Sequence, residues 1–212
     1  YAPLVPAACR VLVGPRYALL RPEFAAARPA ALERRKKFTG VRRVLVSLGG
    51  MDPQNLTERV ARLLAAARGD RPLAVTAVIG DGRQAEAIRR AAAGMDIKII
   101  IGASNMAELM RDADVAIGGM GGTAWERCAL GLPTLALVLA DNQRPAAARM
   151  QAAGLVIDAL TPDELDEAAL RRLLDFDQPT YVAMSAAVAA QCDGEGAARV
   201  AAAVQAMVRE AA

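Results

Sequence analysis

The chain has 212 residues, a length that can bury a substantial core and that fits one domain. Hydrophobic residues make up 54% of it but aromatic residues only 3%, so the core must be built from Ala, Val, Leu and Ile, which favours helices layered on a sheet. The net charge of +3 comes from 26 basic residues spread among 23 acidic ones, a balance that suits an anionic ligand and does not indicate nucleic-acid binding.

The sequence contains no histidine, which removes the commonest general base and the commonest metal ligand. The three cysteines, Cys9, Cys128 and Cys192, follow no metal-binding spacing, and we expect each to be a small buried hydrophobe in a reducing cytoplasm rather than a disulfide partner. We expect neither a signal peptide nor a membrane-spanning segment. A cytoplasmic protein is therefore predicted, and we also expect it to have neither a metal nor a cofactor.

Residues 1–40 differ in pattern from the rest of the chain. Residues 9–14 could form a strand, but Pro15, Pro22 and Pro29 favour an extended connector with at most short helical pieces. The charged run at 33–37 is interpreted as a solvated face of that connector.

From residue 41 onward, apolar strands alternate with helices. Strands are expected at 43–48, 73–79, 97–101, 114–117, 134–139 and 155–157. We expect Asp52 and Pro53 to begin the first of the helices and the segment Thr161-Pro-Asp-Glu164 to begin one that ends near Leu174. Two alanine-rich helices, near 179–190 and 195–210, complete the chain. The alternation predicts an α/β fold with a doubly wound, six-stranded parallel sheet.

In such a sheet, ligands bind beyond the carboxyl ends of the strands. Each glycine-rich or amide-rich turn follows a predicted strand, so all are expected at one edge of the sheet: 49–52, 80–82, 102–105, 118–126 and 140–143. The turn at 118–126 is the richest, with four glycines before a predicted helix. Backbone N–H groups at the start of a helix form a site for phosphate or another anion.

Polar side chains next to this turn suit a nucleotide. Thr123 and Glu126 lie close to one helical face, and the Glu126 carboxylate can accept two hydroxyl hydrogen bonds, as a ribose diol requires. A capping carboxylate paired with Thr123 is the alternative. Asn142 and Gln143 both donate and accept, which suits the hydroxyl and acetamido groups of a sugar, although Asn142 could instead cap a helix.

Two further interpretations of the glycines stay open. Gly119, Gly121 and Ala124 match the spacing of a dinucleotide fingerprint, with Asp141 near the distance of an acidic ribose ligand, but that fingerprint belongs on the first strand–helix–strand unit. The glycines could also serve only the close packing of strand on helix. At the end of the first strand, the pair 49–50 would flank a diphosphate.

Several segments resemble those of GT-B-type nucleotide-sugar enzymes. Residues 121–126, Gly-Gly-Thr-Ala-Trp-Glu, followed by Gly-Leu-Pro at 131–133 and Asp-Asn-Gln at 141–143, are similar to an element of the C-terminal, nucleotide-binding half of GT-B glycosyltransferases. The combination of five segments more specifically resembles the UDP-sugar hydrolases of pseudaminic acid biosynthesis: Tyr17-Ala-Leu-Leu-Arg-Pro-Glu-Phe24, Ser47-Leu-Gly-Gly-Met-Asp-Pro53, Asn105-Met-Ala-Glu-Leu-Met110, Trp125-Glu-Arg-Cys128 and Ala140-Asp-Asn-Gln143.

This resemblance implies a metal-free, inverting hydrolysis in which water attacks the anomeric carbon of a UDP-diacetamido-trideoxyhexose and UDP leaves. It implies that Glu126 holds the ribose and that Asn142 and Gln143 hold the sugar. It assigns the remaining nucleotide contacts to Gly121, Gly122 and Thr123 for the diphosphate, beside Gly49 and Gly50, and to the backbone of Gly102, Ala103 and Ser104 for the uracil. The water-activating base of the family is a histidine in an N-terminal domain, so no catalytic residue is expected in this chain.

The resemblance also divides the chain. Residues 1–40 are predicted to be the remnant of an N-terminal domain with the interdomain connector, and residues 41–212 to be a Rossmann-like UDP-sugar-binding domain, the C-terminal domain of a GT-B protein. The expected partners are UDP or a UDP-sugar and the missing N-terminal domain, without which the chain should be inactive. The alternatives are a GT-B glycosyltransferase and a non-catalytic nucleotide-binding module.

Overall fold

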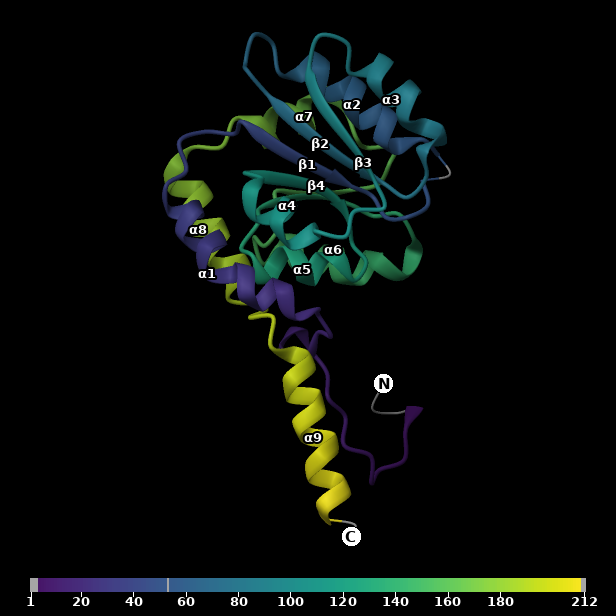
Figure 1. Ribbon diagram of the computed structural model, residues 1–212, viewed down its shortest axis with the longest axis vertical. Coiled ribbons are helices and arrows are strands. Elements are labelled where there is room, and N and C mark those ends of the chain that lie inside the picture. The colour runs from purple at the N-terminus through teal and green to yellow at the C-terminus, as the bar shows by residue number, and fades with distance from the viewer. Residues whose placement is uncertain (1–3, 53, 211–212) are drawn as a thin grey trace.

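The computed structural model describes residues 4–52 and 54–210 (Figure 1). Six strands form one sheet in the order β3-β2-β1-β4-β5-β6, and every neighbouring pair is parallel. The strands are β1 (Arg43–Ser47), β2 (Ala74–Ile79), β3 (Asp96–Ile101), β4 (Val115–Gly119), β5 (Thr134–Leu137) and β6 (Asp158–Leu160). The predicted doubly wound, six-stranded sheet is confirmed.

Helices cover both faces of the sheet (Figure 1). One face carries α2 (Leu56–Ala67), α3 (Ala85–Ala91) and α7 (Glu167–Leu174). The other carries α1 (Pro22–Lys36), α4 (Met106–Asp112), α5 (Thr123–Ala129) and α6 (Arg144–Ala152), with α8 (Gln178–Ala189) beside α1. The last helix, α9 (Gly196–Glu210), extends away from the body of the molecule. Short turns of 3-10 helix include η2 (Pro15–Tyr17), η3 (Gly82–Gln84) and η4 (Asp141–Gln143).

The central strands are unbroken apolar runs because both faces of the sheet are buried. In β1, Leu45 packs into the core beneath α4 and α5, whereas Val44 and Val46 pack into the core beneath α2 and α7. All three side chains are at most 2% exposed. A strand covered on both sides needs apolar residues at every position, because successive side chains point to opposite faces.

The prediction of an extended connector before residue 41 is wrong. Residues 9–14 form no strand, and Pro22–Lys36 is a helix of 15 residues with Pro29 inside it. Pro22 stands in the first helical turn, where its missing N–H removes no helical bond. An interior proline costs about 3 kcal/mol, but Phe24 and Ala31 are fully buried against the core and offset this penalty.

The interpretation of residues 33–37 as a solvated run holds for Glu33 and the two lysines but not for the two arginines. Lys36 and Lys37 have exposed side chains, at 70% and 75%. Arg35 is buried, and its guanidinium donates to the backbone carbonyls of Met110, at 2.7 Å, and of Ala113. Arg34 forms an ion pair with Asp114. The two arginines thus fasten the end of α1 to the end of α4 and to the residue that precedes β4.

Two elements begin later than predicted. The last strand is Asp158–Leu160 rather than 155–157. The backbone N–H and the hydroxyl of Thr161 both donate to Glu164, at 2.8 Å, but this pair closes a turn. The helix α7 starts only after Asp166, whose carboxylate accepts from the Ala169 N–H at 2.8 Å. The capping chemistry was identified correctly but was assigned to the wrong element.

Asp52 caps α2, as predicted, although the helix begins only at Leu56. Its two carboxylate oxygens accept from the N–H groups of Leu56 and Thr57, both at 2.8 Å. Asn55, at the N-cap position, has a left-handed backbone and makes no side-chain cap bond. The predicted place of Pro53 at the start of this helix falls outside the described residues.

We expect Asp52→Ala to lower the free energy of unfolding by about 1–2 kcal/mol, because two N–H groups of the first turn lose their acceptor. Urea denaturation would measure the change. Asp52→Asn, which keeps one acceptor oxygen, should lie between the wild type and the alanine variant. An unchanged midpoint for the alanine variant would contradict the capping role.

Candidate functional site

The strand order reverses between β1 and β4, and two of the predicted glycine turns meet there. The pairing of β1 with β4 ends at Ser47 opposite Gly118. Beyond it, the chain leaves β1 through Gly49, whose φ of 103° favours glycine, and leaves β4 through Gly121. Open parallel sheets bind ligands beside this reversal point, at the carboxyl ends of the strands.

The four glycines of the turn at 118–126 fall into two kinds. A side-chain carbon on Gly118 would lie 2.5 Å from the Arg127 guanidinium, and one on Gly119 would lie 3.1 Å from Leu139. Gly121 and Gly122 are exposed, and nothing lies within 4 Å of the corresponding positions. Close packing therefore accounts for the first pair and leaves the second pair without a packing reason.

Glu126 is half-buried and is not the partner of Thr123. Within the described part of the chain its carboxylate makes no hydrogen bond, and α5 has no side-chain cap. Burial raises the pKa of Glu126, while the charges of Arg21 and Arg127 act in the opposite direction. The capping alternative is therefore not what the structure contains, and the carboxylate is available to a ligand.

Arg127 lies next to the turn and was missed in the sequence analysis. The residue is only 2% exposed, and burial lowers the pKa of its guanidinium to about 10. The guanidinium donates to the Gly119 carbonyl at 2.6 Å and to the Thr123 hydroxyl at 3.2 Å. The sequence feature that could have revealed it is the spacing of four residues between Thr123 and Arg127, which places both on one side of a helix whose other inward residues are apolar.

The turn after β3 leads back across the sheet to α4, which contacts α1 and β1. Gly102, with a φ of 61°, donates its N–H to the Ile79 carbonyl at 2.9 Å. Gly102 and Ser104 are exposed, and Ala103 is half-buried against the core. The uracil contacts expected from these three residues stay a prediction.

The turn after β5 holds the two predicted sugar-binding amides. The carbonyl oxygen of the Gln143 side chain accepts from the Leu139 N–H at 3.0 Å, which leaves its NH2 group as the part free to bind a ligand. Asn142 is exposed and caps neither η4 nor α6. Asp141 pairs with Arg144 at 2.9 Å. The sugar contacts of both amides stay a prediction.

Two pockets lie at opposite edges of the sheet. One of about 440 Å³ is at the carboxyl edge, between the turns after β1 and β2, and includes Gly49, Gly50 and Gly80. Gly80 must be glycine, because a side-chain carbon there would lie 2.0 Å from the Gly50 carbonyl oxygen. The flanking turns thus fix the position of the 49–50 pair.

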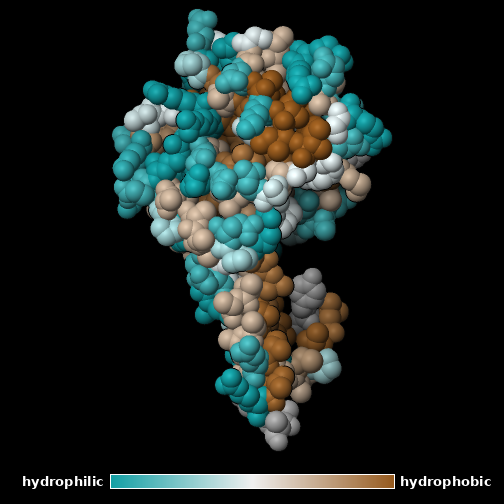
Figure 2. All heavy atoms as spheres, in the orientation of Figure 1, coloured by the Kyte–Doolittle hydropathy of each residue, from teal (hydrophilic) through white to brown (hydrophobic). Residues whose placement is uncertain are grey.

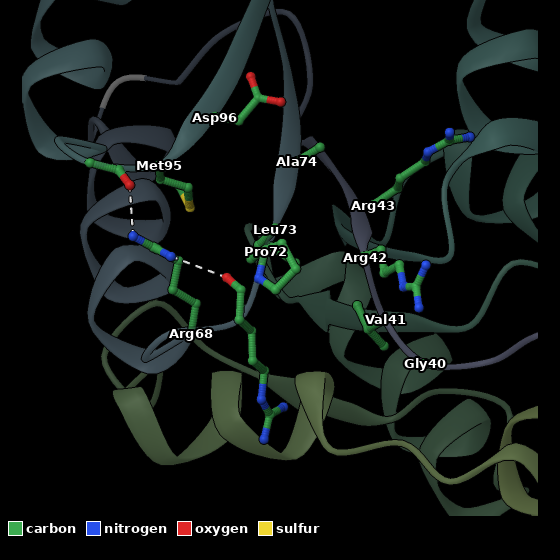
Figure 3. A pocket seen from close by; sticks show the side chains of 12 residues that line it. Gly40, Val41, Arg42, Arg43, Arg68, Pro72, Leu73, Ala74, Met95 and Asp96 are labelled. Carbon is green, nitrogen blue, oxygen red and sulfur yellow. Dashed lines mark hydrogen bonds between the residues drawn. The ribbon is translucent and has the colours of Figure 1, made fainter.

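The larger pocket, of about 670 Å³, opens at the amino edge, away from every predicted binding turn (Figure 3). Its arginines do not converge on a ligand position. Arg68 donates to the carbonyls of Arg71 and Gly94, at 3.1 and 2.6 Å, and the side chains of Arg42 and Arg43 point away from Met95 (Figure 3). Size alone therefore does not identify the functional site.

Residues 4–52 and 54–210 contain no helix that is both long and apolar enough to cross a membrane. They also contain no cluster of three or more His, Cys, Asp or Glu side chains that could hold a metal ion. Cys128 and Cys192 are buried, as expected, but the expectation is wrong for Cys9, which is exposed.

No protein-family model matches the chain. The chain is similar to the uncharacterized protein MJ1062 of Methanocaldococcus jannaschii, with 35% identity over 136 residues, 62% of this chain and 28% of that protein. It is also similar to the spore coat polysaccharide biosynthesis protein SpsG of Bacillus subtilis, with 29% identity over 205 residues, 92% of this chain and 58% of that protein. The chain therefore spans less than two thirds of either relative.

Solved structures share the fold at low sequence identity. Acinetobacter baumannii MurG matches with a TM-score of 0.66 and 16% identity, over 82% of this chain and 52% of that one. Staphylococcus aureus MnaA, solved with UDP, matches with a TM-score of 0.62 and 15% identity, over 90% of this chain and 54% of that one. The chain has the Rossmann-like α/β fold of a GT-B domain and spans about half the length of these proteins.

Proposed function

We propose that this chain is the UDP-binding part of a nucleotide-sugar enzyme. The observation that carries the proposal is the pair of open glycines, Gly121 and Gly122, at the reversal point of the sheet, followed by the hydroxyl of Thr123 and the unpaired carboxylate of Glu126. The similarity to a polysaccharide biosynthesis protein and the shared fold with a UDP-bound structure support the same proposal.

In this proposal each part of UDP has its own contacts. The N–H groups of Gly121, Gly122 and Thr123 donate to the diphosphate oxygens, beside Gly49 and Gly50. The Glu126 carboxylate accepts from the ribose hydroxyls. The backbone of residues 102–104 contacts the uracil, and the free amide groups of Asn142 and Gln143 contact the sugar.

The reaction that we propose for the whole protein is hydrolysis of a UDP-diacetamido-trideoxyhexose in nonulosonic acid biosynthesis, such as that of pseudaminic acid. Water attacks the anomeric carbon with inversion, the bond from that carbon to the diphosphate oxygen breaks, and UDP leaves with the electron pair. Donors arranged around the leaving diphosphate stabilise the charge that develops on it. This chain, which has no histidine, supplies the leaving-group site, and an N-terminal domain supplies the base that activates water.

The proposed N-terminal domain has a surface on which to pack. Exposed apolar residues, among them Val204, Met207 and Val208, form an apolar side of α9, and Leu4 and Val13 are exposed near the other end of the chain (Figure 2). A stripe of this kind on a projecting helix is typical of a surface covered by another domain.

Binding of UDP tests the proposal. Calorimetry of the chain with UDP, UMP and NAD should give the highest affinity for UDP, and the chain alone should not hydrolyse the UDP-sugar. A folded chain that binds no UDP would contradict the proposed site. A GT-B glycosyltransferase would use the same UDP contacts, so an assay of the whole protein without an acceptor separates the two: release of the free sugar together with UDP indicates the hydrolase.

We expect Glu126→Gln to weaken UDP binding about tenfold, because an ionised acceptor of the ribose hydroxyls becomes neutral. The preference for UDP over deoxy-UDP should shrink at the same time. Glu86→Gln, in an exposed residue of α3, changes the charge equally and should have no effect. Equal affinity of the wild type and Glu126→Gln for UDP would remove the ribose role.

A further inference from the structure

Arg127 is buried beside the glycine turn without a carboxylate partner. No ion pair to it exists among residues 4–52 and 54–210, and it is 2% exposed. A buried charge without a counter-charge is costly, and an apolar side chain of similar size would fill the same space without that cost. Packing therefore does not explain why an arginine stands here.

The guanidinium lies against the carboxyl end of β4, beside the last residue that pairs with β1. Their pairing ends at Ser47 opposite Gly118, so the carbonyl of Gly119 lies just beyond the ladder and accepts from Arg127 Nη2 at 2.6 Å. Nη1 lies so close to Gly118 that a side-chain carbon there would be 2.5 Å from it. The last residues of β4 are thus shaped around this cation.

Arg127 also restricts the direction in which the Thr123 hydroxyl can donate its hydrogen. Nη1 donates to Thr123 Oγ1 at 3.2 Å, so that oxygen acts as an acceptor toward the arginine. A hydroxyl oxygen engaged in this way directs its own hydrogen elsewhere. Within the described residues no acceptor takes that hydrogen, which leaves it free for an oxygen of a ligand at Gly121 and Gly122.

We propose that Arg127 is the positioning residue that makes this turn selective for a diphosphate: its charge attracts the doubly anionic group, and its Nη1 fixes the Thr123 hydroxyl as a donor toward it. This inference rests on the proposed UDP site and adds the source of its charge selectivity. Burial disfavours the charged form of Arg127, the charge of the neighbouring Glu126 acts in the opposite direction, and a bound diphosphate would add further negative charge beside the guanidinium.

Arg127→Met tests the inference by calorimetry with UDP and with uridine. The affinity for UDP should fall about 10- to 100-fold, because a charge-assisted contribution is lost, while the affinity for uridine should stay the same. The dependence of UDP binding on NaCl should also become weaker. A purely structural role would lower both affinities together. Arg62→Met, in an exposed arginine of α2, makes the same charge change away from the turn and should leave both affinities unchanged.

Two further variants keep the test decisive if Arg127→Met does not fold. Arg127→Lys keeps the charge with fewer fixed donors, and Thr123→Val removes only the hydroxyl, so each should reduce the ratio of UDP to uridine affinity below that of the wild type. A wild-type ratio in both would overturn the role of Arg127. If the folded wild type binds neither ligand, the proposed UDP site fails. If it binds UDP and Arg127→Met binds UDP equally well, only the inference about Arg127 fails.

Discussion

Gly122→Val should abolish measurable UDP binding and leave the chain folded. Nothing lies within 4 Å of the position that a side-chain carbon would take at Gly122, and its φ of −54° and ψ of −34° suit any residue. The valine would occupy the space in front of the backbone N–H groups, where the proposed diphosphate lies. We expect the affinity to fall by more than about 100-fold, a loss of roughly 3 kcal/mol, while the unfolding midpoint stays close to that of the wild type.

Gly118→Ala makes the contrasting change, in a glycine of the same turn that close packing requires. Its new side-chain carbon would lie 2.5 Å from Arg127 Nη1, so either the guanidinium or the strand must move. We expect a loss of about 1–3 kcal/mol in the free energy of unfolding, because inserting a methyl group into a filled space strains the packing. Calorimetry and urea denaturation of both variants measure binding and stability separately. If Gly122→Val bound UDP as tightly as the wild type, the open space at the turn would not be the ligand's.

The difference between these two glycines could not be predicted from the sequence. The position of the turn could be predicted, because an apolar strand that ends in several glycines before a helix places them at the carboxyl edge of a parallel sheet. Gly118 and Gly122, however, are residues of the same type in the same turn. Only the packed positions of Arg127 and Leu139 distinguish the glycines that are required by their neighbours from those that face open space.

In the first forty residues the sequence led to a wrong prediction. Pro22 and Pro29 oppose an interior helical position, so local propensity favoured an extended chain. Tertiary contacts outweigh this propensity, because Phe24 packs in the core and the Arg28 guanidinium donates to the carbonyls of Ala129, Ala189 and Cys192 at 2.5–3.0 Å. Partners more than a hundred residues away leave no signal in the local sequence.

The predicted strands and caps show where local rules were sufficient. Leu45 and its neighbours are apolar because both faces of β1 are buried, and Asp52 caps α2 through contacts only four and five residues away. Thr161 and Glu164 also pair as predicted, but whether such a pair opens a helix depends on the residues that follow, and here Asp166 takes that role. Contacts between residues a few positions apart could be predicted from the sequence. Which helix or turn such a contact belongs to was harder to predict.

Arg35 offers the largest expected loss of stability from a single side chain. It is 2% exposed, and its guanidinium donates to the carbonyls of Met110 and Ala113 at the C-terminal end of α4, where carbonyl groups have no helical partner. A cation at this end of a helix is also favoured by the helix dipole. We expect Arg35→Ala to lower the free energy of unfolding by about 2–5 kcal/mol, because buried carbonyls lose their donors and a cavity forms.

Lys37→Ala belongs to the same charged run and is the control. The Lys37 side chain is 75% exposed and lies 3.4 Å from Glu33, a surface ion pair that contributes at most about 1 kcal/mol. Arg35→Lys, which keeps the charge but not the forked donors, should lie between the two. Urea denaturation of the three variants gives the comparison. Equal midpoints for Arg35→Ala and Lys37→Ala would mean that the whole run is solvated, as its sequence alone suggested, whereas a large loss for Arg35→Ala alone would mean that the Arg35 guanidinium fastens α1 to the end of α4.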